Sequence, residues 1–318
     1  MKVIALLPVK NEAWILPAYL SSVSQIADEI IALDDNSEDN TREILLNANA
    51  KVETFHSNSG ERHSMSELRN KLLELGRANG GTHFIWLDAD EAFTANFLKN
   101  GRALLERLQP GQKLSMQWLA LWKTVDKFRD DQSVWSNNFK DFIVCDHPSY
   151  VFEERFLSEG RTQGPNTKET LVKLPLEEGA VLHFQFVPWQ KFQLKQAWYR
   201  CLELINAPNT AETINATYAI TLDDPKVALR QIPNEWTENL KIDPMITGTP
   251  ASWHLNEILK LFNKHGIEFF EPLQIWHINE LALEFSNKTG RQPTSIIRKP
   301  GIISRIKGKA KRVIKGQK

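Results

Sequence analysis

Three acidic residues, Asp88, Asp90 and Glu91, directly follow an apolar stretch in the segment FIWLDADEAF at 84–93. An apolar strand that ends in clustered carboxylates is either a solvated strand end or a place where a cation is held. In an extended segment Asp88 and Asp90 would lie on the same side, close enough to share one cation. Mg²⁺ or Mn²⁺ held by one or two carboxylates, with diphosphate oxygens completing the shell, suits nucleotide substrates. The segment is therefore a candidate site for a divalent metal and a diphosphate, and a solvated strand end stays the alternative because a lone D-x-D often occurs by chance.

A second pair of acids, Asp34 and Asp35, ends the stretch EIIALDD at 29–35, just before a turn. Asn36 tolerates positive φ, and Ser37 or Asp39 can cap the helix that begins near Asp39. Turn and cap formation account for Asn36, Ser37 and Asp39, but they do not explain why two carboxylates stand at the strand end. Asp35 is therefore a candidate ligand contact.

The first 125 residues alternate short apolar runs with amphipathic stretches, which predicts a largely parallel sheet flanked by helices. We expect strands at 2–9, 29–35, 51–57, 83–90 and 113–122, and helices at 12–25, 38–48, 62–78 and 94–108. In such sheets ligands bind at the carboxyl ends of the strands, and both acidic clusters follow strands.

The pattern changes after residue 125. Residues 126–187 are irregular apart from a strand at 179–186, and we expect them to complete the domain begun by 1–125. Residues 188–290 form a mostly helical, proline-interrupted region with a helix at 189–206, and 291–318 form a tail.

The formal net charge of zero hides an asymmetry between this tail and the rest of the chain. The tail carries ten Lys and Arg and no acid, which leaves 29 bases against 39 acids in the preceding 290 residues. An acidic body argues against binding nucleic acid. Apolar residues of the tail fall within an arc of roughly 120° on a helical wheel: they are Ile302, Ile303, Ile306, Ala310, Val313 and Ile314. This pattern predicts a helix lying on an anionic membrane surface, with a disordered basic terminus as the alternative.

Two cysteines, Cys145 and Cys201, have no metal-site spacing, so we expect free thiols in a reducing compartment. The short apolar run at the start lacks a cleavage site, and no stretch approaches the ~20 apolar residues that span a bilayer. We expect a cytoplasmic protein, peripheral on the inner face of the membrane.

Several nucleotide-using classes are disfavoured by the motifs. No G-x-G-x-x-G follows a strand, and no G-x-x-x-x-G-K-S/T occurs, which argues against dinucleotide oxidoreductases and P-loop NTPases. The D-x-D-x-T motif of haloacid-dehalogenase enzymes fails because Ala92 holds its fifth position and because the motif follows the fourth strand.

Four segments in order resemble the inverting family 2 glycosyltransferases, whose fold is called GT-A. They are LPVKNEAWIL at the first strand end, LDDNSEDNT at the second, LRNKLLELG on the third helix, and FIWLDADE. The resemblance covers about residues 3–93, and Asn36 stands where the family more often has Gly. It implies an α/β fold of GT-A type, with a mixed, mostly parallel sheet flanked by helices, and we expect the mostly helical C-terminal region to follow this domain. Residues 1–125 would bind the nucleotide-sugar, and 126–187 would form the acceptor side.

Roles follow from the resemblance by position. Residues implied in the nucleotide-sugar pocket are Pro8, Lys10, Asn11, Glu12, Asp35, Arg69, Asn70 and Asp88. Asp90 would be the direct ligand of Mn²⁺ or Mg²⁺, Asp88 would face both ribose and metal, and His183 would be a third ligand or a core histidine. The donor would be a nucleotide-sugar, most simply a UDP-sugar. The acceptor would be a glycan or a lipid-linked molecule of bacterial envelope polysaccharide synthesis.

Transfer to an acceptor hydroxyl with inversion needs a carboxylate general base within hydrogen-bond reach. Glu169 is the first candidate for this base, and Asp141, Asp146, Glu153 and Glu154 compete with it. Five tryptophans flank the proposed acceptor region and could stack on sugar rings: Trp118, Trp122, Trp135, Trp189 and Trp198. Two other functions stay open, a sugar-phosphate nucleotidyltransferase and a non-catalytic nucleotide-sugar-binding protein.

Overall fold

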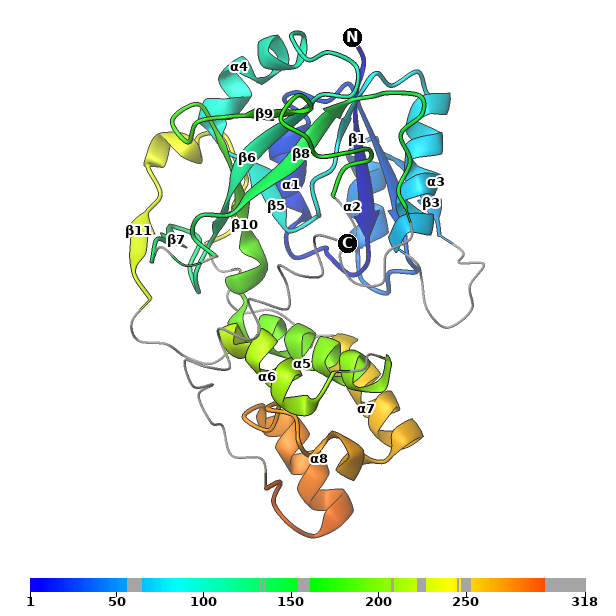
Figure 1. Ribbon diagram of the computed structural model, residues 1–318, viewed down its shortest axis with the longest axis vertical. Coiled ribbons are helices and arrows are strands. Elements are labelled where there is room, and N and C mark those ends of the chain that lie inside the picture. Colours follow the sequence, from blue (N-terminus) through cyan, green and yellow to red (C-terminus); the bar gives the residue numbers. More distant parts are fainter. Residues whose placement is uncertain are drawn as a thin grey trace. The chain divides into compact units, whose positions relative to one another are not determined.

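The computed structural model describes residues 1–55, 65–131, 133, 135–153, 161–206, 209–221, 227–244, 246 and 253–294. The chain divides into two compact units (Figure 1). The first comprises residues 1–187 and 227–247, and the second comprises 188–226 and the residues from 248 onward.

A mixed sheet forms the centre of the first unit, and its strands run in the order β3-β2-β1-β4-β8-β6-β10-β5, with β9 paired to β6. The strands are β1 (Val3–Val9), β2 (Glu29–Asp34), β3 (Lys51–Thr54), β4 (His83–Ile85), β5 (Glu91–Phe93), β6 (Lys113–Ala120), β8 (Phe139–Cys145), β9 (Leu171–Lys173) and β10 (Ala180–His183). The neighbours β3, β2, β1 and β4 are parallel, whereas β8 pairs antiparallel with both β4 and β6. This mostly parallel sheet confirms the expected α/β fold class.

Helices cover both faces of this sheet. Helices α1 (Leu16–Val23), α2 (Thr41–Asn47) and α4 (Ala95–Leu105) share one core with alternate residues of β1, whereas α3 (Met65–Ala78) packs on the other face. Strand β1 is VIALLPV, in which apolar side chains point to both faces, as a central parallel strand buried on both sides requires.

Two expectations about the strands were wrong. Strand β8 lies between β4 and β6, although the sequence around it looked irregular. The predicted strand 83–90 ends at Ile85, and the Glu91 N–H donates to the Asp88 carbonyl at 3.0 Å, which closes a turn over residues 88–91. Asp88 and Asp90 therefore lie in a turn rather than in the extended segment that we expected.

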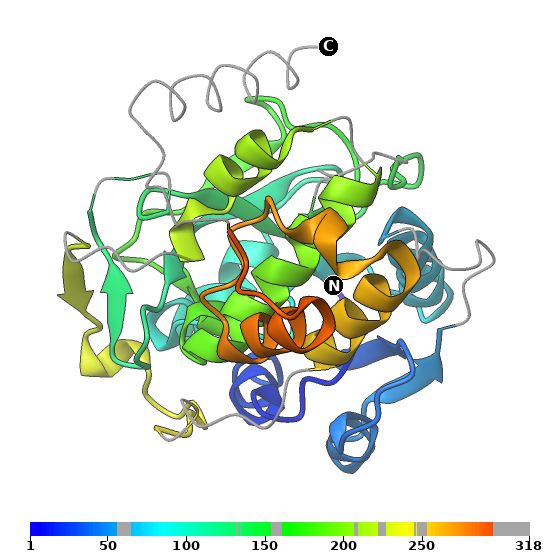
Figure 2. The same cartoon turned by 90° about the horizontal axis from the view of Figure 1, so that it is seen from below.

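Residues 227–247 return to the first unit from the region that we expected to be mostly helical. Strand β11 (Leu229–Gln231) pairs antiparallel with β7 (Lys127–Arg129), and both views place the two strands side by side (Figures 1 and 2). The Ile232 N–H donates to the Asp126 carbonyl, and the Lys241 N–H donates to Ser21 Oγ on α1. The segment is thus bonded into the first unit at several points.

The second unit is helical, with α5 (Trp189–Asn206), α6 (Ala211–Thr217), α7 (Trp253–His265) and α8 (Asn279–Thr289) around its own apolar core. Gly290, in the left-handed conformation at φ 71°, ends α8.

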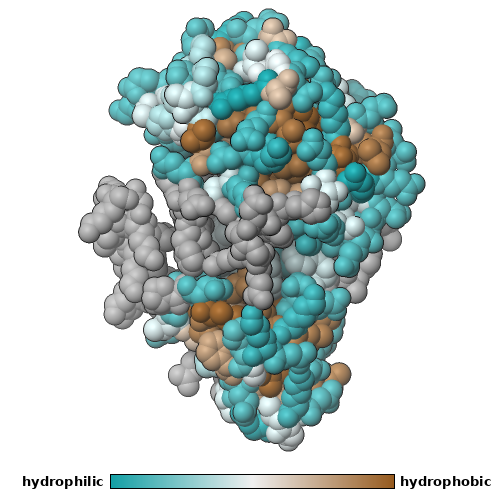
Figure 3. All heavy atoms as spheres, turned by 90° about the vertical axis from the view of Figure 1, so that its right-hand side faces the viewer, coloured by the Kyte–Doolittle hydropathy of each residue, from teal (hydrophilic) through white to brown (hydrophobic). Residues whose placement is uncertain are grey.

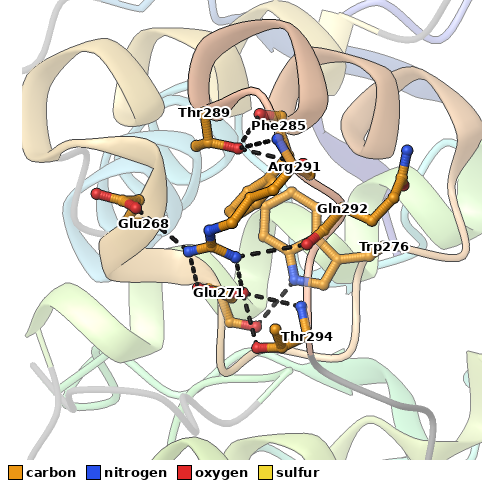
Figure 4. Close-up of polar contacts among 8 residues, drawn as sticks. All are labelled: Glu268, Glu271, Trp276, Phe285, Thr289, Arg291, Gln292 and Thr294. Carbon is orange, nitrogen blue, oxygen red and sulfur yellow. Dashed lines mark hydrogen bonds and ion pairs between the residues drawn. The ribbon is translucent and has the colours of Figure 1, made fainter.

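Arg291 and Thr294 then bind back to Glu271 in a group of contacts that we call the C-terminal clasp (Figure 4). The Arg291 guanidinium donates to both Glu271 oxygens at 2.6 and 2.8 Å, and the Thr294 N–H donates to Glu271 at 2.8 Å. The folded unit therefore extends at least to Thr294, four residues into the expected tail. The membrane-binding residues predicted at 302–314 lie outside the described residues.

Hydrophilic side chains cover much of the face shown in Figure 3, with apolar side chains between them, as on most folded proteins. Among the described residues, no helix is both long enough and apolar enough to cross a membrane. Cys145 and Cys201 are buried free thiols, as expected.

Candidate functional site

The loops that follow β1 and β2 interlock at the carboxyl edge of the sheet. Asn11 and Asn36 both have positive φ, at 54° and 55°, which Asn adopts more readily than most residues. The Asn11 N–H donates to Ser37 Oγ at 2.9 Å, and its side-chain oxygen accepts from the Glu38 N–H at 2.7 Å. The Glu12 N–H donates to Thr41 Oγ1 at 2.8 Å. These polar side chains therefore fix the shape of the loops to one another.

Lys10 and Asp35 meet above this pair of loops. Val9 pairs with Asp34 in the parallel register, so the next residue on each strand, Lys10 and Asp35, extends from the same edge. Lys10 Nζ lies 3.2 Å from Asp35 Oδ2. Glu12 accepts a hydrogen bond from Trp14 Nε1, and Pro8 lies within β1 itself. Of the residues predicted for the nucleotide pocket, the structure brings Lys10, Asn11, Glu12 and Asp35 together.

Asn70 and Arg69 lie on α3 and contact the segment around Phe152. Asn70 donates to the Phe152 carbonyl at 2.9 Å and accepts from the Phe152 N–H at 2.8 Å, so its amide is used on this backbone. The Arg69 guanidinium lies 5.7 Å from the Phe152 ring centroid, and Phe152 packs edge-on against Trp86 just after β4. Asn70 thus supports a loop that borders the site, whereas we expected it to support the base and diphosphate of the donor.

Glu91 closes the acidic turn from inside the protein. Its carboxylate is fully buried and accepts four hydrogen bonds. Oε1 accepts from Trp118 Nε1 at 2.8 Å and from Arg161 Nη2 at 2.9 Å, whereas Oε2 accepts from the Asp88 N–H at 2.9 Å and from Arg161 Nη1 at 2.7 Å. The cation held by Glu91 is therefore a guanidinium.

Arg161 connects this carboxylate to the rest of the turn. Its Nη1 also donates to the Trp86 carbonyl at 3.2 Å, and its Nη2 lies 3.1 Å from Asp88 Oδ2. Burial lowers the pKa of Arg161, but the charges of Asp88 and Glu91 outweigh burial and raise it, so Arg161 stays protonated. Burial also raises the pKa of Glu91, and the charge of Arg161 is the main influence that opposes this rise.

Asp90 and His183 face each other on the other side of the turn. His183 is the cross-strand partner of Glu91 in the β10–β5 pair, and the Phe184 N–H donates to the Asp90 carbonyl at 2.8 Å. His183 Nε2 lies 3.6 Å from Asp90 Oδ2, and both side chains are at least 90% buried. The Trp118 ring stacks on the imidazole with centroids 4.1 Å apart. An oxygen donor and an imidazole nitrogen this close are chemically suited to Mn²⁺, with other positions left for phosphate oxygens and water.

Among the described residues, no cluster of three or more potential ligands is already assembled around a metal position. One reason why Asp88 does not complete such a cluster is that one of its carboxylate oxygens is paired with Arg161. Its side chain nevertheless remains 40% exposed, in contrast to Asp90. The candidate metal ligands are thus the Asp90–His183 pair, whose side chains already face each other, and the more accessible Asp88.

Glu169 is not near this pair, and the structure does not support its predicted role as the base. It precedes β9, which pairs with the start of β6 at Lys113, whereas His183 pairs with the other end of β6 at Ala120. Seven residues of strand separate these positions, a distance of about 23 Å. Glu169 is also exposed, and a hydrogen bond from Thr167 lowers its pKa, which is the wrong direction for a base that works near neutral pH.

The competing acids have separate positions. Asp141 is buried, accepts from Thr162 Oγ1 and lies 3.8 Å from Lys113 Nζ, so it anchors the chain after Arg161. Asp146 is held by two hydrogen bonds from Arg77, both at 2.8 Å. Glu153 is exposed beside Phe152, and Glu154 lies outside the described residues.

Aromatic side chains continue from His183 towards β7. Phe186 lies edge-on to His183 at 5.3 Å, and its ring lies 5.4 Å from Trp122 and 6.0 Å from Trp135. Trp118, Trp122 and Trp135 therefore belong to one cluster with the Asp90–His183 pair. Trp189 and Trp198 belong to the helical unit.

Three residues of the site were missed from the sequence: Glu91 as an internal anchor, Arg161, and Trp118 as the support of His183. Glu91, the third acid of DADE, could have been recognised as an anchor from the sequence. Two carboxylates are enough for one metal, so a third carboxylate indicates a second cation nearby. Nothing in the turn-rich segment around Arg161 identified it as that cation.

Residues 5–143 match the sequence model of Glycosyl transferase family 2, a range that contains the interlocked loops and the acidic turn. Residues 5–143 are a family 2 glycosyltransferase domain. The match is to the same family that the four sequence motifs predicted. No curated protein matches the sequence of this chain.

Several solved structures are also similar to this chain. TarS from S. aureus is 18% identical over 70% of this chain and 43% of that chain, with a TM-score of 0.37. TarS 1-349 in complex with UDP-GlcNAc is 15% identical over 94% of this chain and 93% of that chain, with a TM-score of 0.39. Glucosyl-3-phosphoglycerate synthase from Mycobacterium tuberculosis in complex with Mn²⁺, UDP and glucosyl-3-phosphoglycerate is 21% identical over 37% of this chain and 43% of that chain, at 0.27. The chain spans less than half the length of the first and third of these, and such TM-scores are too low to support a functional argument.

Proposed function

We propose that this family 2 glycosyltransferase moves a sugar from a nucleotide-sugar, with UDP as the nucleotide, to a hydroxyl of a glycan or lipid-linked acceptor. The observation that carries the proposal is the convergence of charged groups at one edge of the sheet. Strands β2, β1 and β4 are parallel neighbours. The Lys10–Asp35 pair follows the first two, and the acidic turn follows the third, so both lie at their carboxyl ends.

The residues divide this work between the nucleotide and the sugar. Asp35 accepts hydrogen bonds from the base or ribose, with Lys10 holding its carboxylate in place. Asp90 and His183 hold Mn²⁺ or Mg²⁺ on the diphosphate side, with Asp88 reaching the same region from the surface. When bound, the cation takes up negative charge on the departing nucleoside diphosphate.

The acceptor occupies the side of the site next to the partly exposed Trp135, because an aromatic ring face suits a sugar ring. Inversion needs a carboxylate that removes the acceptor proton. We assign this role to Glu153 or Glu154, which were among the predicted candidates, whereas Asp141 is buried beside Lys113 and Asp146 is bound by Arg77.

A membrane-bound acceptor is part of the proposal on account of residues 295–318. They carry nine Lys and Arg and no acid, and each basic residue near anionic headgroups contributes about 1 kcal/mol of binding. This segment brings the enzyme to the inner face of the membrane, where lipid-linked acceptors of envelope polysaccharides are available.

Hydrolysis and transfer from a panel of UDP-, GDP-, dTDP- and CMP-sugars, each with Mn²⁺, Mg²⁺ or chelator, test the proposal. We expect turnover of a UDP-sugar that chelator abolishes and that Asp90→Asn reduces at least 100-fold. Glu178→Gln is the matched control, because it removes an exposed carboxylate from the same unit. Full activity of Asp90→Asn in chelator would refute the metal role. Pyrophosphate release from UTP and a sugar phosphate would identify a nucleotidyltransferase instead.

A further inference from the structure

Glu91 and Arg161 form a buried charge pair that contacts Asp88 directly and reaches His183 through Trp118. The pair holds the Asp88 N–H through Glu91 Oε2, the Asp88 carboxylate through Arg161 Nη2, and the Trp118 indole through Glu91 Oε1. Trp118 in turn stacks on His183, which faces Asp90 at 3.6 Å. One buried carboxylate thus connects the turn that carries Asp88 and Asp90 to the imidazole on a different strand.

The geometry of this pair leaves Glu91 no capacity to bind a metal. Two oxygens of an ionised carboxylate offer about four acceptor positions, and Glu91 uses four. Arg161 is fixed equally well, because its guanidinium lies between the Phe142 ring at 5.0 Å and the Trp118 ring at 5.5 Å. Its side chain is 12% exposed, so the pair is shielded from solvent. Such a bidentate, stacked arrangement requires the planar fork of arginine.

We propose that Arg161 is a positioning residue for the cation of this glycosyltransferase: through Glu91 and Trp118 it holds Asp88, Asp90 and His183 in a metal-ready arrangement before the donor binds. The proposal rests on the metal site of the proposed function. Arg161 occupies one oxygen of Asp88 and thereby restricts its rotation, while much of the Asp88 side chain stays accessible. Outer-shell partners of this kind orient ligands, and their loss typically lowers metal affinity 10- to 100-fold.

Two variants separate positioning from simple folding. Arg161→Lys keeps the charge and removes the bidentate fork. Replacing Arg161 alone with a neutral residue would leave the Glu91 carboxylate buried and unpaired, and a buried unpaired charge destabilises most folds. The double variant Arg161→Met/Glu91→Met avoids this, because it removes one positive and one negative charge, leaves the local net charge unchanged and keeps a comparable volume. Arg77→Lys is the matched control, because Arg77 makes a similar bidentate pair with Asp146 in the same unit.

The first readout is the binding of Mn²⁺ in the presence of UDP. Electron paramagnetic resonance measures the unbound Mn²⁺, so this readout requires no catalysis. We expect wild-type affinity for Arg77→Lys and a loss of 10- to 100-fold for Arg161→Lys and for the double variant, which should still show cooperative unfolding. Wild-type Mn²⁺ affinity in a folded double variant would overturn the proposal.

The second readout is the NMR signal of the His183 ring in metal-free protein, which senses the stacked Trp118. We expect the signal to shift in the double variant and not in Arg77→Lys, because Trp118 loses its acceptor on Glu91. An unchanged His183 signal would overturn the link through Trp118. Failure of the wild type to bind Mn²⁺ would refute the metal in the proposed function, and the His183 signal would still decide whether Arg161 positions this side chain.

Discussion

Acidification from pH 7 to pH 5 should destabilise the helical unit through a buried histidine on α7. His254 is 3% exposed, stacks on Trp253 with ring centroids 4.0 Å apart, and lies edge-on to Trp198 at 5.5 Å. Burial, with smaller contributions from Lys195 and Lys191, lowers the pKa of His254 from 6.5 to about 2. The imidazole is therefore neutral in the folded unit across this range, whereas the unfolded chain binds a proton as the pH falls below 6.5.

The size of the effect follows from this difference in proton binding. A group that is protonated only in the unfolded state favours unfolding, so stability is present above pH 6.5 and is lost as the pH falls. Between pH 7 and pH 5 the loss for one such histidine is about 2 kcal/mol. His277 adds to it in the same direction, because burial lowers its pKa to about 4. Glu271 affects stability in a lower pH range. Hydrogen bonds from Arg291 lower its pKa to about 2, so its contribution to the free energy of unfolding is lost only below pH 4.5.

Hydrogen–deuterium exchange of α7 peptides, corrected for the intrinsic rate at each pH, measures the opening free energy of this helix. We expect the opening free energy to fall by about 2 kcal/mol or more from pH 7 to pH 5. His254→Phe keeps the ring stack and removes the titration, so about 2 kcal/mol of this dependence should disappear. His265→Gln is the control, because His265 is exposed at the end of the same helix. An equal pH dependence in wild type and His254→Phe would refute the reasoning.

Other parts of the chain lead to three further expectations. Glu169→Gln should leave kcat within twofold of wild type in the sugar-transfer assay, whereas Glu153→Gln or Glu154→Gln should lower kcat about 10²- to 10⁴-fold; the opposite result would return the role of base to Glu169. Asn70→Ala removes both hydrogen bonds to the Phe152 backbone and should cost about 1–3 kcal/mol in urea denaturation, and no loss would show that this loop is held by other contacts. A chain ending at Thr294 should keep the C-terminal clasp and the melting temperature of the helical unit but lose flotation with anionic vesicles; retained flotation would exclude the tail as the membrane contact.

The sequence predicted the part of the fold that depends on continuous apolar runs. Strands β1 and β2 and helix α5 are apolar or amphipathic over their whole length, so their positions were predicted within about two residues. Strand β8, FKDFIVC, carries polar residues at its start because Lys140 and Asp141 have partners there, and this broke the strand pattern. The segment after β4 was mistaken for strand because residues 84–87 remain apolar. Strand β4 ends at Ile85, the Trp86 N–H still donates to the Phe142 carbonyl of β8, and the chain then turns over residues 88–91.

The site was predictable where neighbouring strand ends define it and not where distant segments meet. Asp35, Asp88 and Asp90 follow parallel strands, and one topological rule was enough to find them. Arg161 lies 70 residues from its partner Glu91 in sequence, and the contact depends on how β5, β6 and the chain after β8 pack. Glu169 lies only 14 residues before His183 in sequence, but β9 and β10 pair with opposite ends of β6, so the two residues are far apart in the fold.

The return of residues 227–247 to the first unit affects how the two units could be exchanged during evolution or by protein engineering. The chain passes between the units three times, near residues 188, 227 and 248. A fusion made at residue 187 would separate β7 from β11, which together form a small second sheet. The unpaired edge of β7 would then favour association with other strands. The helical unit therefore cannot be gained or lost at a single junction. A working chimera would need to exchange 188–226 as an internal cassette and the segment after 247 as a second one.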